Sequence, residues 1–356
     1  MKDTIRSTNE VTGDEAAPVP EELPAAQRTI ALLRLKGRLG DFIAQMTAAG
    51  ALIVVFIFLS FASPDFLTTN NLINIIEQNA VTAVIALGMT FVIITAGIDL
   101  SVGSTAAMTG VLGVELIAHG WNWPLALLAA IIAGGVVGLG NGLLISVARL
   151  NPFIATLGMM TVVRGLTDVA TNAVVVEGPS DVLGPDNFGV IGLGQVAGIP
   201  VALIILVVLS VLAYLLLSHT RLGRYTYAIG SNQEAARLSG IPVKRYLLAV
   251  YVILGLLTGL AGMIAVSRLG IGEPNFGIGL ELDVIAATVI GGASLFGGQG
   301  TILGTLLGVF LIGLIRDGSV LLDVNLFTQN VIIGIVIWLA VLWDQFRRRR
   351  ISSLAS

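Results

Sequence analysis

The sequence predicts an all-α polytopic membrane protein with about ten transmembrane helices, some of them broken. Two observations come from composition: 55% of the 356 residues are hydrophobic, and 12% are charged. A soluble globular domain carries about a quarter charged residues. The third observation is that the apolar residues form segments close to the roughly 20 residues that an α-helix needs to cross a bilayer core.

Ten apolar segments have this character. The second and third are separated only by the sequence GIDLS, and the eighth and ninth only by FGGQG. Breaks between helices are therefore predicted at these two places. In order, the predicted spans are residues 42–62, 79–97, 101–118, 124–148, 152–172, 199–217, 246–267, 283–297, 301–316 and 326–343.

The two ends of the chain differ from the region between them. Residues 1–40 combine prolines and scattered acids with a basic end, so they are predicted to form a disordered, basic cytoplasmic tail. Residues 41–346 form the predicted transmembrane domain, which contains a cytoplasmic loop at 218–245. Residues 347–356 form a basic cytoplasmic C-terminus.

The positive charges predict how the chain is oriented. Cytoplasmic loops of membrane proteins carry an excess of Lys and Arg. With a cytoplasmic N-terminus, most of the 19 Lys and Arg residues fall on the cytoplasmic side, while loops 63–78 and 173–198 contain none and lie outside. An even number of spans then places both termini in the cytoplasm.

Glycines recur every fourth residue in two of the predicted spans. Small residues at this spacing form one stripe on a helix and let a neighbouring helix approach closely. We therefore expect helix packing at Gly134, Gly138 and Gly142, and at Gly300, Gly304 and Gly308. Residues 95–117 also align without gaps on residues 290–312, which suggests an internal repeat.

A few polar residues inside apolar regions are candidates for a translocation path. A buried charge is costly in a bilayer, so Asp99 either caps a helix near the cytoplasmic interface or lines a path at a chain break. Arg164 and Asp168 stand four residues apart and are expected to form an internal ion pair. The path candidates are Thr90, Asp99, Ser101, Ser104, Asn141 and Asn151.

Several kinds of site are missing from the sequence. None of its three lysines stands in a GxxxxGK[ST] loop, so ATP binding by that motif is excluded. No metalloprotease, serine-hydrolase or paired-carboxylate pattern occurs, so we do not expect an enzyme. The chain has no cysteine, and its two histidines, His119 and His219, are far apart, so neither a metal site nor a cofactor is predicted.

The stretch SNQEAARLSGIPV, residues 231–243, is a polar island with helix signals at both ends. Ser231 and Glu234 fit a capping box, Gly240 suits a left-handed C-terminal cap, and Pro242 prevents continuation. The predicted helix has about two turns and is too short to be stable alone. A docking partner is therefore expected.

The sequence EAARLSG fits the pattern EAAxxxG and resembles the loop by which permease subunits of ATP-binding-cassette importers dock onto their ATPase subunits. Further blocks, ITAGIDLSVGS, RLGRYTYAIGSNQEAARLSGI and ELDVIAATVIGGASLFGGQGTILGTLLG, resemble the permease family for ribose, xylose, galactose and related sugars. The resemblance covers roughly residues 64–346. It implies ATPase coupling through Ser231, Glu234, Ala235, Ala236, Arg237 and Gly240.

The same resemblance implies the setting in which the protein works. It implies a bacterial inner-membrane homodimer with a pore at the dimer interface, a cytoplasmic ATPase subunit and an extracytoplasmic sugar-binding protein. The sequence does not identify the sugar. A permease for branched-chain amino acids is a related alternative, and a proton-coupled secondary transporter using Asp99, Glu115 and Asp168 is an alternative of another class.

Overall fold

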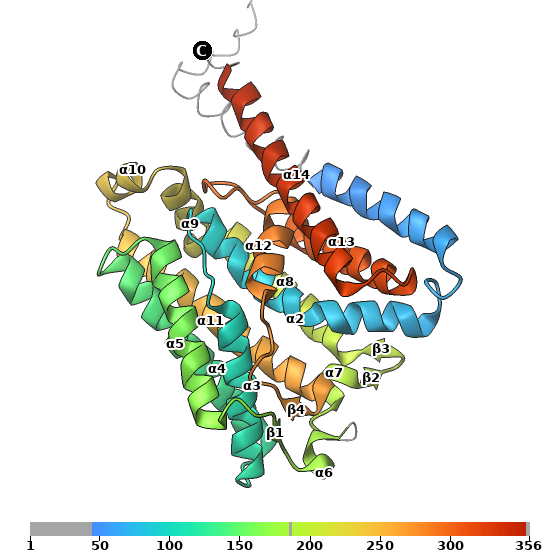
Figure 1. Ribbon diagram of the computed structural model, residues 1–356. Coiled ribbons are helices and arrows are strands. Elements are labelled where there is room, and N and C mark those ends of the chain that lie inside the picture. Colours follow the sequence, from blue (N-terminus) through green and yellow to red (C-terminus); the bar gives the residue numbers. More distant parts are fainter. Residues whose placement is uncertain (1–44, 185–186, 354–356) are drawn as a thin grey trace, which may run out of the picture. The chain divides into compact units, whose positions relative to one another are not determined.

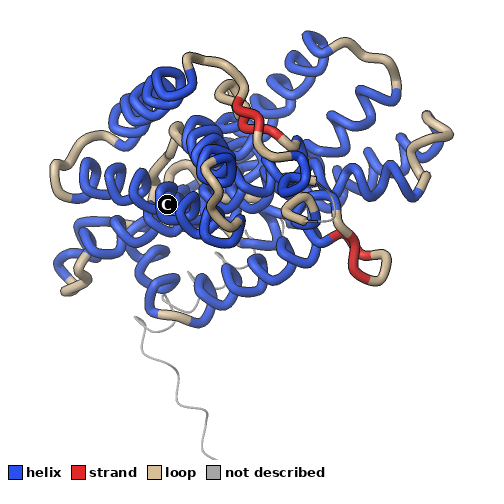
Figure 2. Tube along the Cα trace, turned by 90° about the horizontal axis from the view of Figure 1, so that it is seen from below, coloured by secondary structure: helices blue, strands red, loops and turns tan. Residues whose placement is uncertain are grey.

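Helices make up most of the computed structural model, which describes residues 45–184 and 187–353. These residues belong to a compact unit that starts at Asp41, and the predicted tail 1–40 lies outside the described residues. Figure 2 shows short strand pairs among long helices. The prediction of an all-α membrane protein is confirmed.

Within the described residues, seven helices are long and apolar enough to cross a membrane. α14 (Leu326–Ser353) adds a shorter apolar stretch. α3 (Val102–Ala118) and α12 (Leu280–Ile290) are shorter helices in the third and eighth predicted spans. The seven are Gln45–Ala62, α2 (Thr69–Ile94), α4 (Trp123–Ser146), α5 (Pro152–Thr171), α8 (Val201–His219), α11 (Val243–Leu269) and α13 (Ile302–Leu321).

The second span starts much earlier than the sequence predicted. We expected an outer loop up to residue 78, because this region is rich in polar residues, but α2 begins at Thr69. Thr68 caps the helix by accepting a hydrogen bond from the backbone N of Asn71. The polar side chains contact protein: Asn71 donates to Asp317 at 3.0 Å, and Glu77 is buried. The polar residues of this segment therefore belong to a helix that contacts the rest of the protein, and they do not form a loop.

The eighth span is also corrected. α12 has 11 residues and a length of about 17 Å, roughly half of a bilayer core. The chain reaches it through residues 270–279, which contain only the short strand β4 (Ile271–Gly272), and α12 ends at Ile290. Gly277 lies against Gly103, near the start of α3. Two broken segments therefore meet inside the protein.

Both segments of the suggested internal repeat cross a break from one helix into the next. The first runs from the end of α2 into α3, and the second runs from the end of α12 into α13. The two breaks touch, because the backbone N of Gly298 donates to the carbonyl of Ile94 at 2.8 Å. The likeness therefore includes the local structure at both positions.

The interior is built around α2, which packs against α11, α13, α8 and α12 (Figure 1). α4 lies along α11, and the first glycine set faces that contact. A Cβ on Gly138 would lie 2.2 Å from the carbonyl oxygen of Tyr251. On α13, a Cβ on Gly308 would lie 1.9 Å from the carbonyl oxygen of Ala287 in α12.

The other glycines fit the same picture with one exception. Gly134 and Gly142 also face α11, and Gly304 faces Gly291 at the end of α12. Gly300 precedes the helix, because α13 starts at Ile302, and it has a φ of 151°. The sequence grouped it with the stripe on its four-residue spacing alone, although the predicted span began at residue 301.

Two regions connect these helices on opposite ends of the view in Figure 1. At the bottom, β1 (Val176–Glu177) pairs antiparallel with β4, next to α6 (Ser180–Leu183). α7 (Val190–Leu193) and the pair β2 (Gln195–Val196) and β3 (Ile199–Pro200) complete that connection. At the top, α9 (Arg221–Ser231) and α10 (Gln233–Leu238) join α8 to α11.

Candidate functional site

The polar island forms the short helix α10, but its N-terminal cap differs from the predicted one. Asn232 is the N-cap, and its side-chain oxygen accepts from the backbone N of Ala235 at 2.9 Å. Ser231 ends α9, and its hydroxyl donates to the carbonyl of Tyr227 at 2.9 Å. The sequence placed the cap one residue early because it did not predict α9 as a separate helix.

The two alanines of this helix face different ways. Ala236 is buried in a cluster with Ile229, Val243 and Leu247, so it anchors α10 on α9 and α11. Ala235 is exposed. We expected both alanines to face a partner, and the structure leaves only the first for that role. Leu238, which the sequence did not single out, is 74% exposed.

Glu234 and Arg237 form an ion pair on the exposed side of α10. The Nε of Arg237 donates to the Glu234 carboxylate at 3.0 Å. This hydrogen bond lowers the pKa of Glu234 and raises the pKa of Arg237, so both side chains stay charged near neutral pH. Gly240 has a φ of 81° and ends the segment, in the left-handed conformation that glycine adopts without strain.

Three of the predicted path residues form one buried cluster. The carboxylate of Asp99 accepts from the backbone N and the hydroxyl of Ser101 at 2.8 and 2.6 Å. The amide of Asn141 donates to Asp99 at 3.0 Å and to Ser101 at 2.9 Å. Each of the three side chains is at most 3% exposed. The cluster fastens the break between α2 and α3 to α4.

Of the other three path candidates, Ser104 adjoins this cluster, and Thr90 and Asn151 lie elsewhere. Thr90 is buried between α2 and α13, where its hydroxyl lies 2.7 Å from that of Thr305. Ser104 is buried in the first turn of α3 and donates to the carbonyl of Ser101 at 2.9 Å. Asn151 is exposed and caps α5 by accepting from Phe153. The structure therefore does not bring the six residues together.

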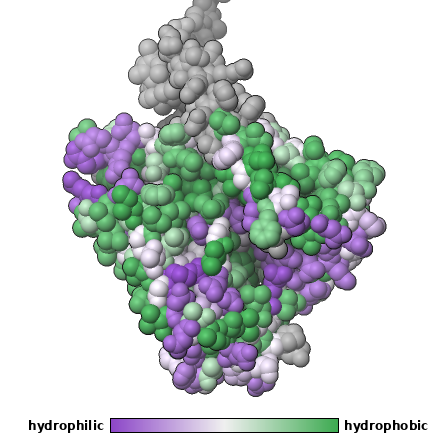
Figure 3. Space-filling model, viewed as in Figure 1, coloured by the Kyte–Doolittle hydropathy of each residue, from purple (hydrophilic) through white to green (hydrophobic). Residues whose placement is uncertain are grey.

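The structure shows instead a polar pocket that the sequence did not predict. It has a volume of about 240 Å³ and lies between α2, α11, α12 and α13. Arg316 of α13 pairs with Asp283 of α12 at 2.6 Å beside it. Figure 3 shows hydrophilic residues gathered around a hollow in the middle of one face, between hydrophobic flanks. The polar side chains lining the pocket are Gln78, Asn79, Thr82, Arg268, Asp283 and Arg316.

Arg164 does not form the expected pair with Asp168. Its guanidinium donates to the carbonyl of Phe276 at 3.1 Å and also to that of Pro274. Oδ1 of Asp168 is buried and has no hydrogen-bond partner among the described residues. Instead of pairing with a residue one helix turn away, Arg164 extends to the segment before α12, where backbone carbonyl groups accept its hydrogen bonds. Arg164 thereby ties α5 to the second broken segment.

Comparison with known proteins identifies the family. A family model described as "Branched-chain amino acid transport system / permease component" matches residues 71–341. The chain is 45% identical to the ribose import permease protein RbsC of Escherichia coli K12 over 294 residues, which are 83% of this chain and 91% of that protein. It is 44% identical to RbsC of Bacillus subtilis over 91% of this chain and 98% of that protein.

A third relative carries a different sugar in its name. The L-arabinose ABC transporter permease protein AraH of Azospirillum brasilense is 39% identical over 92% of this chain and 95% of that protein. No solved structure matches the chain. Because the family model and these relatives cover most of the sequence, the chain belongs to the branched-chain amino acid transport system permease family.

Proposed function

We propose that this protein is the membrane-spanning permease subunit of an ATP-driven importer for a monosaccharide or a related small polyol. The identity of 45% to a ribose import permease over 91% of that protein carries the proposal. Relatives that share this identity are named for ribose, and others are named for arabinose and allose. The subunit forms the pathway and does not itself hydrolyse ATP.

The exposed side of α10 docks onto the cytoplasmic ATPase subunit. The helix is capped at both ends and is fixed to α9 and α11 by buried Ala236. Force applied at Glu234, Arg237 or Leu238 would therefore reach α11 directly. This geometry supports coupling through α10 as a rigid element that inserts into a groove of its partner.

The pathway follows the polar pocket between α2, α11, α12 and α13. Neutral sugars are bound by hydrogen bonds, and Gln78, Asn79 and Thr82 offer amide and hydroxyl groups. Asp283 and Arg316 neutralise each other, which suits an uncharged solute. Polar groups inside a bilayer must be shielded from the lipid chains, and a second copy of the chain packed over the pocket would shield them.

The remaining arrangement follows from charge. Both termini lie in the cytoplasm, since residues 221–245 and the run Arg347–Arg350 carry basic residues that cytoplasmic segments favour. The connection containing α6 and α7 then lies outside and receives a sugar-binding protein. Glu177 and Asp181 are its acidic residues in the described part, and Asp186 lies outside the described residues.

The proposal is tested by uptake in proteoliposomes. The permease is reconstituted with its ATPase subunit, the binding protein is added outside, and radiolabelled ribose, arabinose and allose are offered in turn. We expect accumulation of one of these sugars that requires ATP inside and persists when the proton gradient is removed. Uptake that needs the gradient and not ATP would instead identify a secondary transporter.

The family description makes branched-chain amino acids the second candidate. A zwitterionic substrate needs both an acid and a base, and the pocket offers Arg268 in addition to the paired Asp283 and Arg316. Radiolabelled leucine in the same assay separates the two substrates. ATP-driven uptake of leucine without uptake of any sugar would overturn the proposal.

A further inference from the structure

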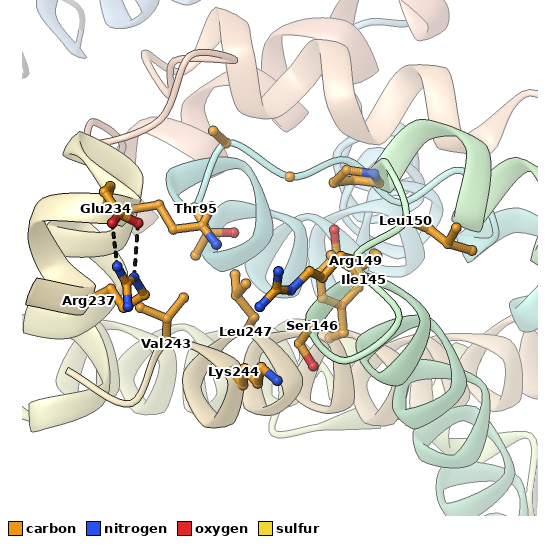
Figure 4. Close-up of a pocket in the computed structure, with 15 residues that line it drawn as sticks. Thr95, Ile145, Ser146, Arg149, Leu150, Glu234, Arg237, Val243, Lys244 and Leu247 are labelled. Carbon is orange, nitrogen blue, oxygen red and sulfur yellow. Dashed lines mark hydrogen bonds and ion pairs between the residues drawn. The ribbon is translucent and has the colours of Figure 1, made fainter. Parts of the chain in front are cut away.

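A second, larger cavity lies between α10 and the membrane-spanning helices. It has a volume of about 800 Å³ and is lined by the break after α2, the end of α4, α10 and the first turns of α11 (Figure 4). One wall belongs to the element proposed to contact the ATPase, and the opposite wall belongs to α4 and the start of α5. A ligand here would touch both.

Three basic side chains line this cavity, and one of them, Arg237, is paired with Glu234. Arg149 follows α4, and Lys244 is the second residue of α11. Neither has an ion-pair partner within residues 45–184 and 187–353. Arg149 also has a φ of 60°, a left-handed conformation that side chains other than glycine, asparagine and aspartate rarely adopt. The turn after α4 therefore directs an arginine at the cavity despite its backbone preference.

Ser146 supplies a third donor and the observation that points to a ligand. Its side chain is 5% exposed and lines the cavity. Its hydroxyl has no hydrogen-bond partner among the described residues, although helical serines can bond to the carbonyl four residues earlier. A buried hydroxyl without a partner is costly. The hydroxyl oxygen is itself shielded from solvent, and rotation of the Ser146 side chain would bring it to an acceptor oxygen bound in the cavity and remove this cost.

Most of the other polar groups of the lining already have partners, and Gln233 of α10 adds a side-chain amide. Glu234 is its carboxylate, and Arg237 neutralises that group at 3.0 Å. The hydroxyls of Thr95 and Tyr251 donate to the carbonyls of Val92 and Ile98 at 2.7 and 3.3 Å. Within the described residues, the cavity therefore retains two unpaired cations, one hydroxyl donor and the Gln233 amide. Figure 4 shows Arg149, Lys244 and Ser146 on one side of it.

We propose that this cavity binds a phosphate group through Arg149, Lys244 and Ser146. Phosphate oxygens accept several hydrogen bonds, and both guanidinium and ammonium groups bind them strongly. The phosphate bridges α4 to α11 beneath α10. It therefore restrains α10 relative to α4. A cytoplasmic phosphate ester or a lipid of the inner leaflet could thus regulate coupling to the ATPase. This regulatory consequence rests on the proposed function, whereas binding does not.

The phosphate can come from a soluble phosphate ester or from an anionic phospholipid. The full chain is placed in nanodiscs of phosphatidylcholine, and binding of radiolabelled inorganic phosphate is measured by equilibrium dialysis. A parallel sample contains phosphatidylglycerol. Saturable phosphate binding in both samples assigns a soluble ligand. Binding that phosphatidylglycerol abolishes assigns the lipid headgroup, and both results support a phosphate site.

Variants test the assigned residues. We expect Lys244→Gln to weaken phosphate binding about tenfold, because a hydrogen bond to a charged group is lost. Arg149→Asn should have a similar effect, and asparagine tolerates the left-handed backbone there. Ser146→Ala should weaken binding by a few fold. The matched control is Arg245→Gln, which removes an exposed charge next to Lys244 but outside the cavity lining.

Two results would overturn the assignment. One is the absence of saturable phosphate binding in phosphatidylcholine together with no retention of phosphatidylglycerol by the purified chain. The other is equal weakening by Arg245→Gln and Lys244→Gln, which would reduce the effect to general surface charge. Thermal unfolding of each variant shows whether it is folded. Sugar uptake is measured separately, so failure of the transport proposal leaves the binding result intact.

Discussion

Single residues in this protein decide how closely the helices approach. Gly138 and Gly308 stand where a side chain would meet a backbone carbonyl, and neither carbonyl can move without moving its helix. The sequence located these positions because a spacing of four residues needs no knowledge of the partner helix. It did not identify α11 and α12 as those partners, since spacing alone carries no information about the neighbour.

The glycine contacts give a prediction with an internal control. Gly138→Ala should lower the free energy of unfolding by about 1–3 kcal/mol, because the new Cβ overpacks the contact with Tyr251. Gly158→Ala in α5 meets nothing within 4 Å and should leave stability unchanged or raise it. Thermal unfolding in detergent measures both. Equal melting temperatures for the two variants would show that α4 and α11 are packed less closely.

Asn79 tests the polar pocket at the level of one side chain. Asn79→Leu keeps the side-chain volume and removes the amide, so sugar uptake at limiting substrate should fall about tenfold. Ser210→Ala is the control, because Ser210 donates to Leu206 within α8, outside this pocket. Initial uptake rates in proteoliposomes provide the measurement. Normal uptake by the leucine variant would remove Asn79 from the path.

At the scale of elements, the polar residues before position 79 led to a wrong predicted start for the second span, although their spacing indicates a helix. Residues 69–78 look like a loop, yet Asn71, Asn74, Gln78 and Thr82 recur at three- and four-residue spacing on one helix face. That pattern predicts an amphipathic start for α2 and, with it, the pocket. The short helix α12 could not be predicted, because the segment before it depends on contacts with Gly103 and Arg164.

The proposed docking role of α10 gives a prediction at this scale. Leu238→Asp should leave folding unchanged, because the side chain is 74% exposed, but should release the ATPase subunit during purification. Ala236→Asp should lower the melting temperature, since it buries a charge in the cluster with Val243 and Leu247. Copurification and thermal unfolding distinguish the two. Retention of the ATPase by the Leu238 variant would place the contact elsewhere on α10.

At the scale of the whole molecule, the positive charges predict that both termini are cytoplasmic. The prediction depends on an even number of crossings, and α12, with 11 residues, is too short to cross a bilayer core by itself. Fusions of alkaline phosphatase, which is active only outside, and of green fluorescent protein at each terminus test it. Green fluorescence at both ends without phosphatase activity is expected. Phosphatase activity at one end would require an odd number of crossings.

The buried contact of Ala236 limits how freely this permease could be rebuilt. A designer who wished to redirect it to a foreign ATPase would naturally exchange the ten or so residues around α10 as a cassette. Because that helix packs on Ile229, Val243 and Leu247, a transplanted sequence would lack the residues on which it packs in its own protein. A working chimaera therefore has to carry α9 and the first turn of α11 along with the contact surface.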